Sequence, residues 1–285
     1  MITRPGTKTS TRVWTIEGGN GRMRSDDLAT EEPLEIRLIA GDERHTVAVT
    51  MRTPGNDFEL ATGFLHGEGI VANRDDIARI SYCVDPEIDA EQQYNIVNVT
   101  LRATSTPDLA PLERHFFTTS ACGVCGKASL DALDLRGCPT LPTGPTISAE
   151  TLYGLPDALG QAQRVFGKTG GLHAAALFTP DGSLIALRED VGRHNALDKL
   201  IGWALLEGRF PLHDCLLLLS GRSSFELLQK SAVAGIPIVA AVSAPSSLAV
   251  ETARRFGITL IGFLRGERCN VYACRERIAL PGGAS

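Results

Sequence analysis

The sequence has no apolar run long enough to cross a membrane. A membrane-spanning helix needs about 20 apolar residues in succession, whereas the longest apolar run here lies around 215–219. The first 30 residues are polar and contain no apolar core of the kind that signal peptides have. We therefore expect no membrane insertion and a cytoplasmic protein.

Positive charge is not in excess, and cysteine is not abundant enough for a disulfide scaffold. The chain of 285 residues has 28 basic and 33 acidic residues, a formal net charge of −5. A net acidic protein is a poor candidate for nonspecific nucleic-acid binding, so no nucleic-acid partner is expected. The seven cysteines are an odd number and few for this length, which favours free thiols in a reducing compartment. Internal repeats and low-complexity segments are also missing.

What is present is an ordinary globular composition, 43% hydrophobic and 21% charged. Residues 1–30 are expected to form a flexible N-terminal tail, and residues 31–112 a small α+β roll. Within the roll, an apolar helical face begins after Asp57 and closes near Gly67. Four segments carry strand patterns, with Gly41-Asp42 as a hairpin turn between the first two: 34–39, 45–51, 80–84 and 94–101.

Residues 148–280 carry the pattern of an α/β domain. Three continuous apolar strands alternate with helices over 224–234 and 246–256, which predicts parallel strands in a sheet covered on both faces. The apolar strands lie at 215–219, 236–242 and 258–263. Upstream, we expect a helix that starts at Pro156, a hairpin over 170–188 and a helix over 195–206. The fold class is therefore α/β, or α+β when the roll is included.

A thiol loop and linker, expected to be mobile, occupies residues 113–147 between these two units. It holds Cys122 and Cys125 in a CxxC spacing among small residues. A structural zinc site needs four ligands, and the other close pair, Cys269 and Cys274, is spaced by five positions. A redox disulfide pair, an incidental linker and a sulfur carrier are the other interpretations. We favour the carrier, because a thiolate attacks persulfides, a second thiol can resolve them, and Lys127 would raise the thiolate fraction.

A zinc-dependent deaminase is the main competitor. Such enzymes combine H-x-E with P-C-x-x-C, and this chain has His66-Gly67-Glu68 ahead of the two loop cysteines. However, Ala121 stands where the motif has proline, and we expect His66 on the surface at the end of the first helix. A zinc hydrolase therefore remains an alternative, and no metal site is expected.

Several long motifs, which together extend from about Glu32 to Tyr272, resemble the FdhD family, the sulfur carrier proteins needed to make active formate dehydrogenase. The loop sequence Ser120-Ala-Cys-Gly-Val-Cys-Gly126 is among them, as is Arg188-Glu-Asp-Val-Gly-Arg-His-Asn-Ala-Leu-Asp-Lys199. The other motifs lie at 53–65, 68–70, 169–177, 220–224, 263–268 and 270–272.

The resemblance implies a sulfurtransferase. Family members accept persulfide sulfur from a cysteine desulfurase and pass it to the molybdenum bis(molybdopterin guanine dinucleotide) cofactor, which then enters apo-formate dehydrogenase. Cys122 matches the persulfide cysteine and Cys125 its partner. The resemblance also implies a fold similar to cytidine deaminases, with three layers, and a homodimer. The cofactor is bound as a substrate, and guanine nucleotides are expected to mimic it. The segment that matches the cofactor-binding one comprises Phe263, Leu264, Arg265, Gly266, Glu267 and Arg268.

The residues themselves support a phosphate-binding pocket. Ser220 and Arg222 follow one strand and precede a helix, and the 263–268 segment follows another strand, where α/β proteins bind ligands. The alternative is that these arginines are solvated loop ends. His173 and His194 are either buried, hydrogen-bonded histidines or, as the resemblance implies, pocket residues.

Two further possibilities stay open. A non-enzymatic chaperone that only binds cofactor and apo-enzyme would keep the arginines but not need the loop cysteines. The remaining cysteines are expected to be structural or incidental, although Cys269 could be a second reactive site. These are Cys83, Cys138, Cys215, Cys269 and Cys274.

Overall fold

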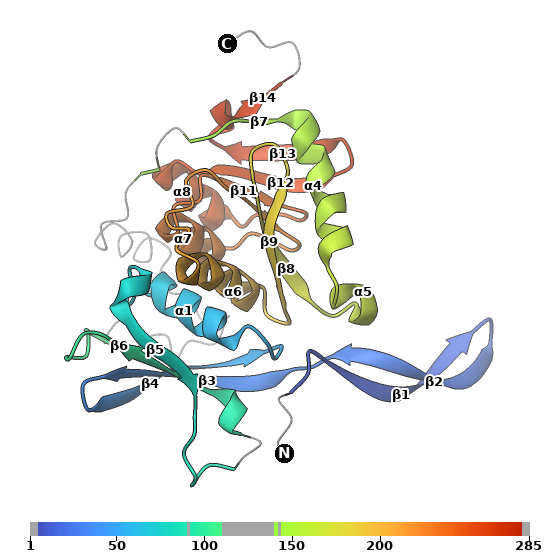
Figure 1. Ribbon diagram of the computed structural model, residues 1–285. Helices are drawn as coiled ribbons and strands as arrows, with labels where there is room; N and C mark the ends of the chain where they lie inside the picture. Colours follow the sequence, from blue (N-terminus) through green and yellow to red (C-terminus); the bar gives the residue numbers. More distant parts are fainter. Residues whose placement is uncertain (1–4, 90–91, 110–139, 142–143, 281–285) are drawn as a thin grey trace.

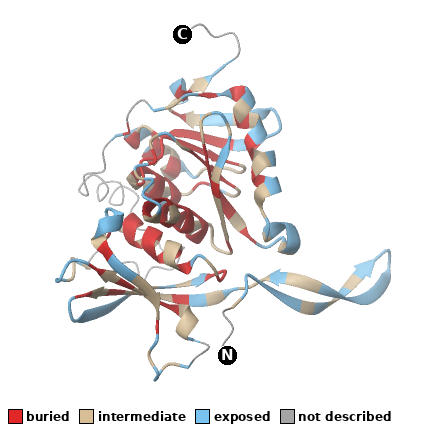
Figure 2. Ribbon diagram, in the orientation of Figure 1, coloured by how far each residue is buried: buried red, intermediate tan, exposed pale blue. Residues whose placement is uncertain are grey.

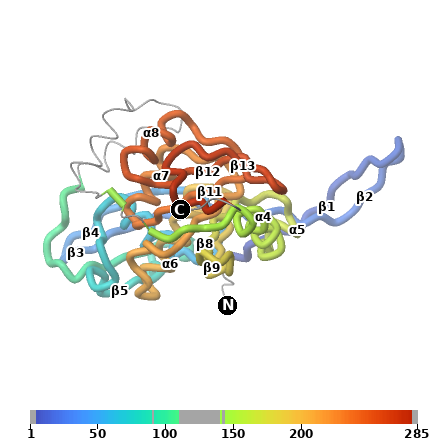
Figure 3. The backbone as a smooth tube through the Cα atoms, turned by 90° about the horizontal axis from the view of Figure 1, so that it is seen from above, coloured from blue at the N-terminus to red at the C-terminus, as the bar shows by residue number. Residues whose placement is uncertain are grey.

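The computed structural model describes residues 5–89, 92–109, 140–141 and 144–280. Figure 1 shows a smaller sheet below, a larger layered unit above it and a hairpin that extends to one side. Seen from above in Figure 3, the hairpin again lies away from the rest of the chain. Figure 2 shows that the buried residues concentrate on the larger sheet and on the helices between the two units. Among the described residues, no helix combines the length and apolar character needed to cross a membrane.

The smaller unit is a four-stranded sheet with helix α1 (Asp57–Gly67) packed on one face. Strand β3 lies between β4, its antiparallel hairpin partner, and β6, to which it runs parallel. Leu34, Ile36 and Leu38 alternate along β3 and meet Leu60 of α1 in the core. The strands are β3 (Glu32–Ala40), β4 (Glu43–Arg52), β5 (Ile77–Tyr82) and β6 (Ile96–Leu101), with 3₁₀ turns η1 (Arg74–Asp76) and η2 (Gln93–Asn95).

The larger unit contains a six-stranded mixed sheet in the order β13-β12-β11-β10-β8-β9. The three continuous apolar strands, β10 to β12, run parallel, as their sequence predicts. The neighbours β8, β9 and β13 are antiparallel. The strands are β8 (His173–Phe178), β9 (Leu184–Asp190), β10 (Leu216–Leu219), β11 (Ile238–Ala241), β12 (Thr259–Arg265) and β13 (Arg268–Ala273).

Helices cover both faces of this sheet (Figure 1). Helices α6 (Arg193–Leu206), α7 (Phe225–Val233) and α8 (Ser247–Phe256) share one core with it, and α4 (Ala149–Ala162) contributes to a second core on the other face. The short helix α5 (Phe166–Thr169) follows α4. The predicted α/β class, with a roll and a three-layer unit, is confirmed. Smaller elements are β7 (Ile147–Ser148), β14 (Ile278–Ala279) and η3 (Arg275–Arg277).

The expected helix start at Pro156 is wrong. Helix α4 begins at Ala149, where the side chain of Ser148 accepts a hydrogen bond of 3.0 Å from the Thr151 N–H. Pro156 lies inside the helix, although a proline there removes one backbone hydrogen bond. The helix continues through it because a buried apolar stripe packs against the sheet on both sides of this position: Leu152, Leu155 and Leu159.

The expected flexible tail over residues 1–30 is also not what the structure shows. Strands β1 (Lys8–Glu17) and β2 (Asn20–Ala29) pair antiparallel over their full length. The turn Gly18-Gly19 has positive φ angles of 56° and 82°, which glycine adopts without strain and which a two-residue hairpin requires. Because this segment is polar, the sequence analysis did not predict the strands. The Gly18-Gly19 pair, which is typical of a hairpin turn, was the one feature that indicated them. We call residues 8–29 the arm.

The roll and the three-layer unit meet where helix α1 crosses helix α6. A Cβ atom on Gly63 would lie 1.9 Å from the Asp198 carbonyl oxygen, and one on Gly202 would lie 1.9 Å from the Glu59 carbonyl oxygen. The two backbones therefore touch, and only glycine fits at either position. Close by, Arg188 of β9 donates two hydrogen bonds to Glu59, at 2.6 and 2.8 Å.

Candidate functional site

The carboxyl ends of the parallel strands lie together at one end of the larger sheet. Ser220 follows β10, Val242 follows β11, and β12 ends at Arg265. Because β8 runs antiparallel to β10, its first residue, His173, lies at the same end. Ligands of α/β proteins bind at this end of the strands.

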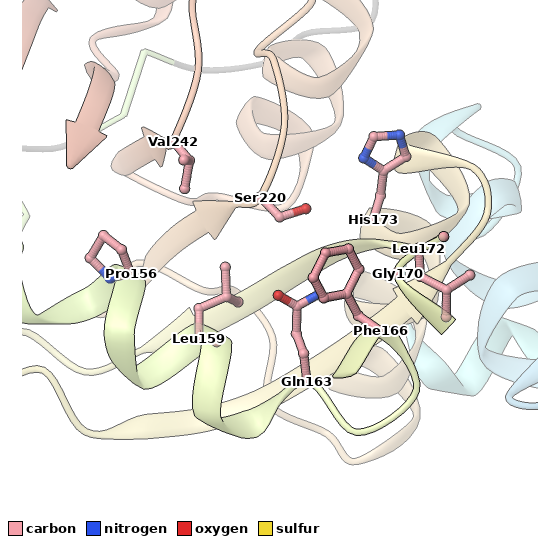
Figure 4. Close-up of a pocket in the computed structure, with 11 residues that line it drawn as sticks. Pro156, Leu159, Gln163, Phe166, Gly170, Leu172, His173, Ser220 and Val242 are labelled. Carbon is pink, nitrogen blue, oxygen red and sulfur yellow. The ribbon is translucent and has the colours of Figure 1, made fainter. Parts of the chain in front are cut away.

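A pocket of about 550 Å³ opens at this end (Figure 4). Three of its residues offer polar side chains: Gln163, His173 and Ser220. The pocket has the size and the mainly apolar character of small-molecule sites. The remaining lining is apolar or glycine: Pro156, Leu159, Gly160, Phe166, Gly170, Gly171, Leu172 and Val242.

Ser220 is fixed by its neighbour across the sheet. Its Oγ accepts a hydrogen bond of 2.8 Å from the Ala174 N–H, and its own N–H donates to the Ala174 carbonyl at 3.0 Å. An Oγ that accepts in this way keeps its own proton for donation to a ligand acceptor. Ser220, which the sequence analysis assigned to cofactor binding, thus lies in the pocket lining.

His173 is half-buried on the pocket wall. Burial lowers its pKa, electrostatic interactions with Arg193 and His194 lower it further, and Asp190 opposes them. The ring is therefore neutral near pH 7 and can donate from one nitrogen and accept at the other. A Cβ atom on Gly221 would be 3.3 Å from its Nδ1, so a glycine at that position gives the ring room.

His194 lies in the first turn of α6 and joins it to the first turn of α7. Its Nε2 is 2.7 Å from Glu226 Oε2 and 3.2 Å from Ser224 Oγ. The hydrogen bond from His194 lowers the pKa of Glu226. These contacts fit the structural interpretation of this histidine, and His194 is not among the residues that line the pocket.

The predicted cofactor segment comprises the end of β12, the turn at 266–267 and the first residue of β13. Phe263 has a positive φ of 53° and donates its N–H to the Ser243 carbonyl at 3.1 Å. Leu264 is fully buried in the core, so its side chain serves packing and not ligand contact. Exposed Arg265 donates from Nε to the Val242 carbonyl at 3.2 Å, which places it beside a pocket-lining residue.

The other predicted site residues are not among those that line the pocket. Gly266 has a positive φ of 51° at the tip of the β12–β13 turn. Glu267 and Arg268 are exposed there, and Arg222 is exposed in the loop before α7. The structure thus brings together Ser220, His173 and the Val242–Arg265 contact. It leaves the side chains of Arg222, Glu267 and Arg268 at the surface.

Gln163 is a pocket residue that the sequence reasoning missed. Its Nε2 atom is buried and has no hydrogen-bond partner among the described residues. In Figure 4 the side chain lies between Leu159 and Phe166. The adjoining turn is held by Glu189, whose carboxylate accepts the N–H groups of Val165 and Phe166 at 3.0 and 2.8 Å. A glutamine at a helix end gives no sequence signal, because only the fold makes its amide a buried, unpaired donor.

The loop cysteines Cys122 and Cys125, and with them Cys138, lie outside the described residues. Cys83 is buried. Burial raises the pKa of Cys269, which favours the unreactive thiol and argues against a second reactive site there. Burial likewise raises the pKa of two others: Cys215 and Cys274.

The expectation that His66 is a surface residue is wrong. The side chain is buried between α1 and the following loop, with 6% of the residue exposed. Its Nδ1 is 2.9 Å from the Val71 carbonyl, and its ring packs edge-on against Phe210. Burial lowers its pKa, although the hydrogen bond to the Val71 carbonyl acts in the opposite direction. Among the described residues, no cluster of three or more potential ligands could hold a metal ion.

Motif residues 188–199 build the junction between the two units. Asp190 is fully buried and accepts hydrogen bonds from the Thr53 N–H at 3.1 Å and from Asn195 at 3.1 Å. Lys199 lies 2.7 Å from Asp190 Oδ2 and donates to the Thr53 carbonyl at 2.8 Å. The charges compensate each other in a site where an isolated charge would be costly. Sequence reasoning had no means to separate this role from ligand binding.

Comparison with known proteins agrees with this architecture. The model of the FdhD/NarQ family matches residues 29–279. A relative from Streptomyces avermitilis is 53% identical over 277 residues, which covers 96% of each chain. One from Mycobacterium tuberculosis is 53% identical over 260 residues, covering 90% of this chain and 92% of the relative. Both are named sulfur carrier protein FdhD.

A solved structure from Desulfotalea psychrophila has a similar fold. It is described provisionally as a formate dehydrogenase accessory protein, and it shares 25% sequence identity with this chain. The TM-score is 0.73, over 96% of this chain and all of the solved one. The family match covers the four-stranded sheet, the six-stranded sheet and the residues that line the pocket. This chain belongs to the FdhD/NarQ family.

Proposed function

We propose that this chain is a sulfur carrier in which Cys122 holds sulfur as a persulfide. The observation that carries the proposal is the CxxC pair, Cys122 and Cys125, in a family whose close relatives are named sulfur carrier protein FdhD. The proposed donor is a cysteine desulfurase. The proposed acceptor is the molybdenum bis(molybdopterin guanine dinucleotide) cofactor of a formate dehydrogenase.

The transfer is a thiolate displacement without net oxidation. The Cys122 thiolate attacks the outer sulfur of the donor persulfide, an S–S bond forms to Cys122, and the donor cysteine leaves as a thiolate. Delivery repeats the step, with the outer sulfur passing to the acceptor and Cys122 leaving as a thiolate. Alternatively, Cys125 attacks the inner sulfur, which releases hydrosulfide and leaves a Cys122–Cys125 disulfide.

The described pocket suits one nucleotide end of such an acceptor. Leu159 and Phe166 would flank a planar base, and the buried Gln163 amide would donate to an acceptor on its ring. Ser220 would donate from Oγ, and Arg265 at the rim would contact phosphate. The cofactor is a substrate here, and the pocket volume of about 550 Å³ is in the range of small-ligand sites.

The proposed cellular location and partners follow from the thiol chemistry of sulfur transfer. Free thiols such as those proposed for Cys122 and Cys125 persist in a reducing compartment, so the cytoplasm is the proposed location. The proposed partners are the desulfurase, apo-formate dehydrogenase and a second copy of the chain.

The test is mass spectrometry of the intact protein after incubation with a cysteine desulfurase and cysteine. We expect one added sulfur, lost on reduction and mapped to the peptide that contains Cys122. Cys122→Ala should abolish it, and Cys125→Ala should retain it if Cys125 acts only afterwards. The matched control is Cys215→Ala, which removes a thiol whose pKa is raised by burial. Loading that survives Cys122→Ala, or none on the wild type, would refute the carrier.

A separate arm measures binding. Guanosine diphosphate, a mimic of the cofactor end, should bind the wild-type pocket and bind Gln163→Leu at least tenfold more weakly, because that variant loses the buried donor. Binding without sulfur loading would instead favour a cofactor chaperone. Metal analysis of the same protein would detect a zinc hydrolase.

A further inference from the structure

The outer edge of strand β2 carries a charge pattern that is complementary to itself. Residues 22–27 read Arg-Met-Arg-Ser-Asp-Asp, a basic half followed by an acidic half. In the described part of the chain, β1 and β2 form a sheet of their own, and β2 has no second strand partner. The arm extends away from the body of the protein (Figure 1, Figure 3). A strand edge of this kind exposes N–H and C=O groups that can pair with another chain.

The register of the arm determines which backbone groups point outward. The two-residue turn Gly18-Gly19 closes the arm. In such a hairpin the pair beside the turn is hydrogen-bonded, and hydrogen-bonded and non-hydrogen-bonded pairs then alternate. Ser25, opposite Arg12, therefore falls in a non-hydrogen-bonded pair. Its N–H and C=O, and those of Met23 and Asp27, point away from β1.

We propose that β2 pairs antiparallel with β2 of a second copy of this chain, with Ser25 of both copies at the two-fold axis. The outward groups of Ser25 then meet their own counterparts, and those of Met23 meet those of Asp27, for about six backbone hydrogen bonds. Arg24 of each copy lies directly opposite Asp26 of the other. These are non-hydrogen-bonded positions, where facing side chains are closest.

The charges select this register over its neighbours. A shift by two residues would set Arg24 against Arg24, or Asp26 against Asp26, and like charges directly opposite are destabilising. A shift by one residue would set outward backbone groups against inward ones. Within one copy, Arg24 and Asp26 are exposed enough to reach a partner and are 3.8 Å apart. The second copy would give each charge another neighbour of opposite sign.

The arm is built to remain extended. Trp14 packs over Gly21, where a Cβ atom would be 2.3 Å from its ring, and Lys8 pairs with Asp27 near the base. A two-stranded hairpin alone is only marginally stable in water. Strand β2 contacts α5, and pairing with a second arm would add backbone hydrogen bonds along its outer edge.

The test uses two single variants that should each dimerise poorly alone and dimerise well when mixed. Arg24→Asp places acidic groups opposite Asp26 in a dimer of that variant, and Asp26→Arg places basic groups opposite Arg24. Each variant alone should dimerise at least tenfold more weakly than the wild type by sedimentation velocity. An equal mixture should restore the dimer, because every facing pair is again opposite in charge. A monomeric wild type, unaffected single variants or no recovery in the mixture would each overturn the proposal.

A second pair of variants tests the backbone edge. Ser25→Pro removes an outward N–H and should abolish dimerisation without breaking the β1–β2 ladder. Arg12→Pro, on the same rung but on the outer edge of β1, is the matched control and should leave the dimer intact. Equal effects of both variants would refute the assignment to the β2 edge. The inference specifies the surface of the pairing proposed above, and sulfur loading of Cys122 should be unchanged in all these variants. A failed dimer test and a failed carrier test are therefore distinguishable.

Discussion

Gly202→Ala should strongly destabilise the protein, because helices α1 and α6 touch at this residue. The added Cβ would lie 1.9 Å from the Glu59 carbonyl oxygen and 2.8 Å from the Gly63 nitrogen. Close carbon–oxygen contacts in proteins are about 3.3 Å. The helices must therefore separate by about 1.4 Å, the difference between those two distances. Both contacting atoms belong to backbone, so no side-chain rotation can relieve the clash.

The magnitude follows from what that separation disturbs. Overpacking a core costs about 1–3 kcal/mol. A shift of this size also loosens the 2.8 Å hydrogen bond from Lys199 to the Thr53 carbonyl, and buried hydrogen bonds to charged groups contribute about 1.5–3 kcal/mol each. Alanine regains about 1 kcal/mol over glycine as a helix former. We expect a net loss of about 3 kcal/mol in the free energy of unfolding.

Urea unfolding of the wild type and variants measures this quantity. The matched control is Gly154→Ala, also within a helix, where an added Cβ meets nothing within 4 Å. That variant should be as stable as the wild type or gain up to about 1 kcal/mol. If Gly202→Ala were as stable as Gly154→Ala, the close crossing of α1 and α6 would be wrong.

Three further predictions concern the junction, His66 and the pocket. Lys199→Met should lower the free energy of unfolding by about 3–5 kcal/mol, because it leaves buried Asp190 without its cation. The control Lys168→Met, at an exposed lysine, should lower it by less than about 0.5 kcal/mol. Equal losses in the two variants would refute the buried Lys199–Asp190 ion pair at the junction. Because the pKa of folded His66 lies below the unfolded value of about 6.5, its contribution to the free energy of unfolding is fully present above that pH and is lost as the pH falls below it. Over that pH range, the free energy of unfolding measured in urea should fall less steeply for His66→Asn than for the wild type. An equal dependence on pH in the two proteins would contradict this. Gln163→Glu should weaken guanosine diphosphate binding as much as Gln163→Leu does in a calorimetric titration, since a carboxylate accepts but does not donate; tight binding by the acid would exclude the amide as the donor.

The parallel strands were predictable because burial on both faces leaves a direct trace in sequence. The run from Leu216 to Leu219 is wholly apolar, and in the structure it lies between α4 on one face and the α6–α8 layer on the other. The hairpin at Gly41-Asp42 was equally readable, since glycine there has a positive φ of 58°. In each case a local property of the residues matches the final environment.

The arm and the pocket were not readable for the opposite reason. Strand β2 is polar and exposed, so no buried face imposes an alternating pattern on residues 20–29. Gln163 becomes a buried donor only after α4 and α5 fold against the sheet. His66 looked like a surface residue because it ends a helix, but Phe210, 144 positions later, covers it. Each missed feature depends on contacts between distant parts of the chain, which local patterns do not contain.

The junction and the pocket are directly connected through neighbouring residues. His173 of the pocket wall is the register partner of Asp190 across β8 and β9, and Asp190 holds the Thr53 N–H of the roll. Any movement of the roll therefore acts on a strand that carries a pocket residue. This explains why motif residues that never face the pocket accompany the proposed site: the roll fixes the end of the sheet where the ligand would bind. It also follows that Lys199→Met should reduce guanosine diphosphate binding under conditions where the variant is still folded, although Lys199 touches no part of the pocket.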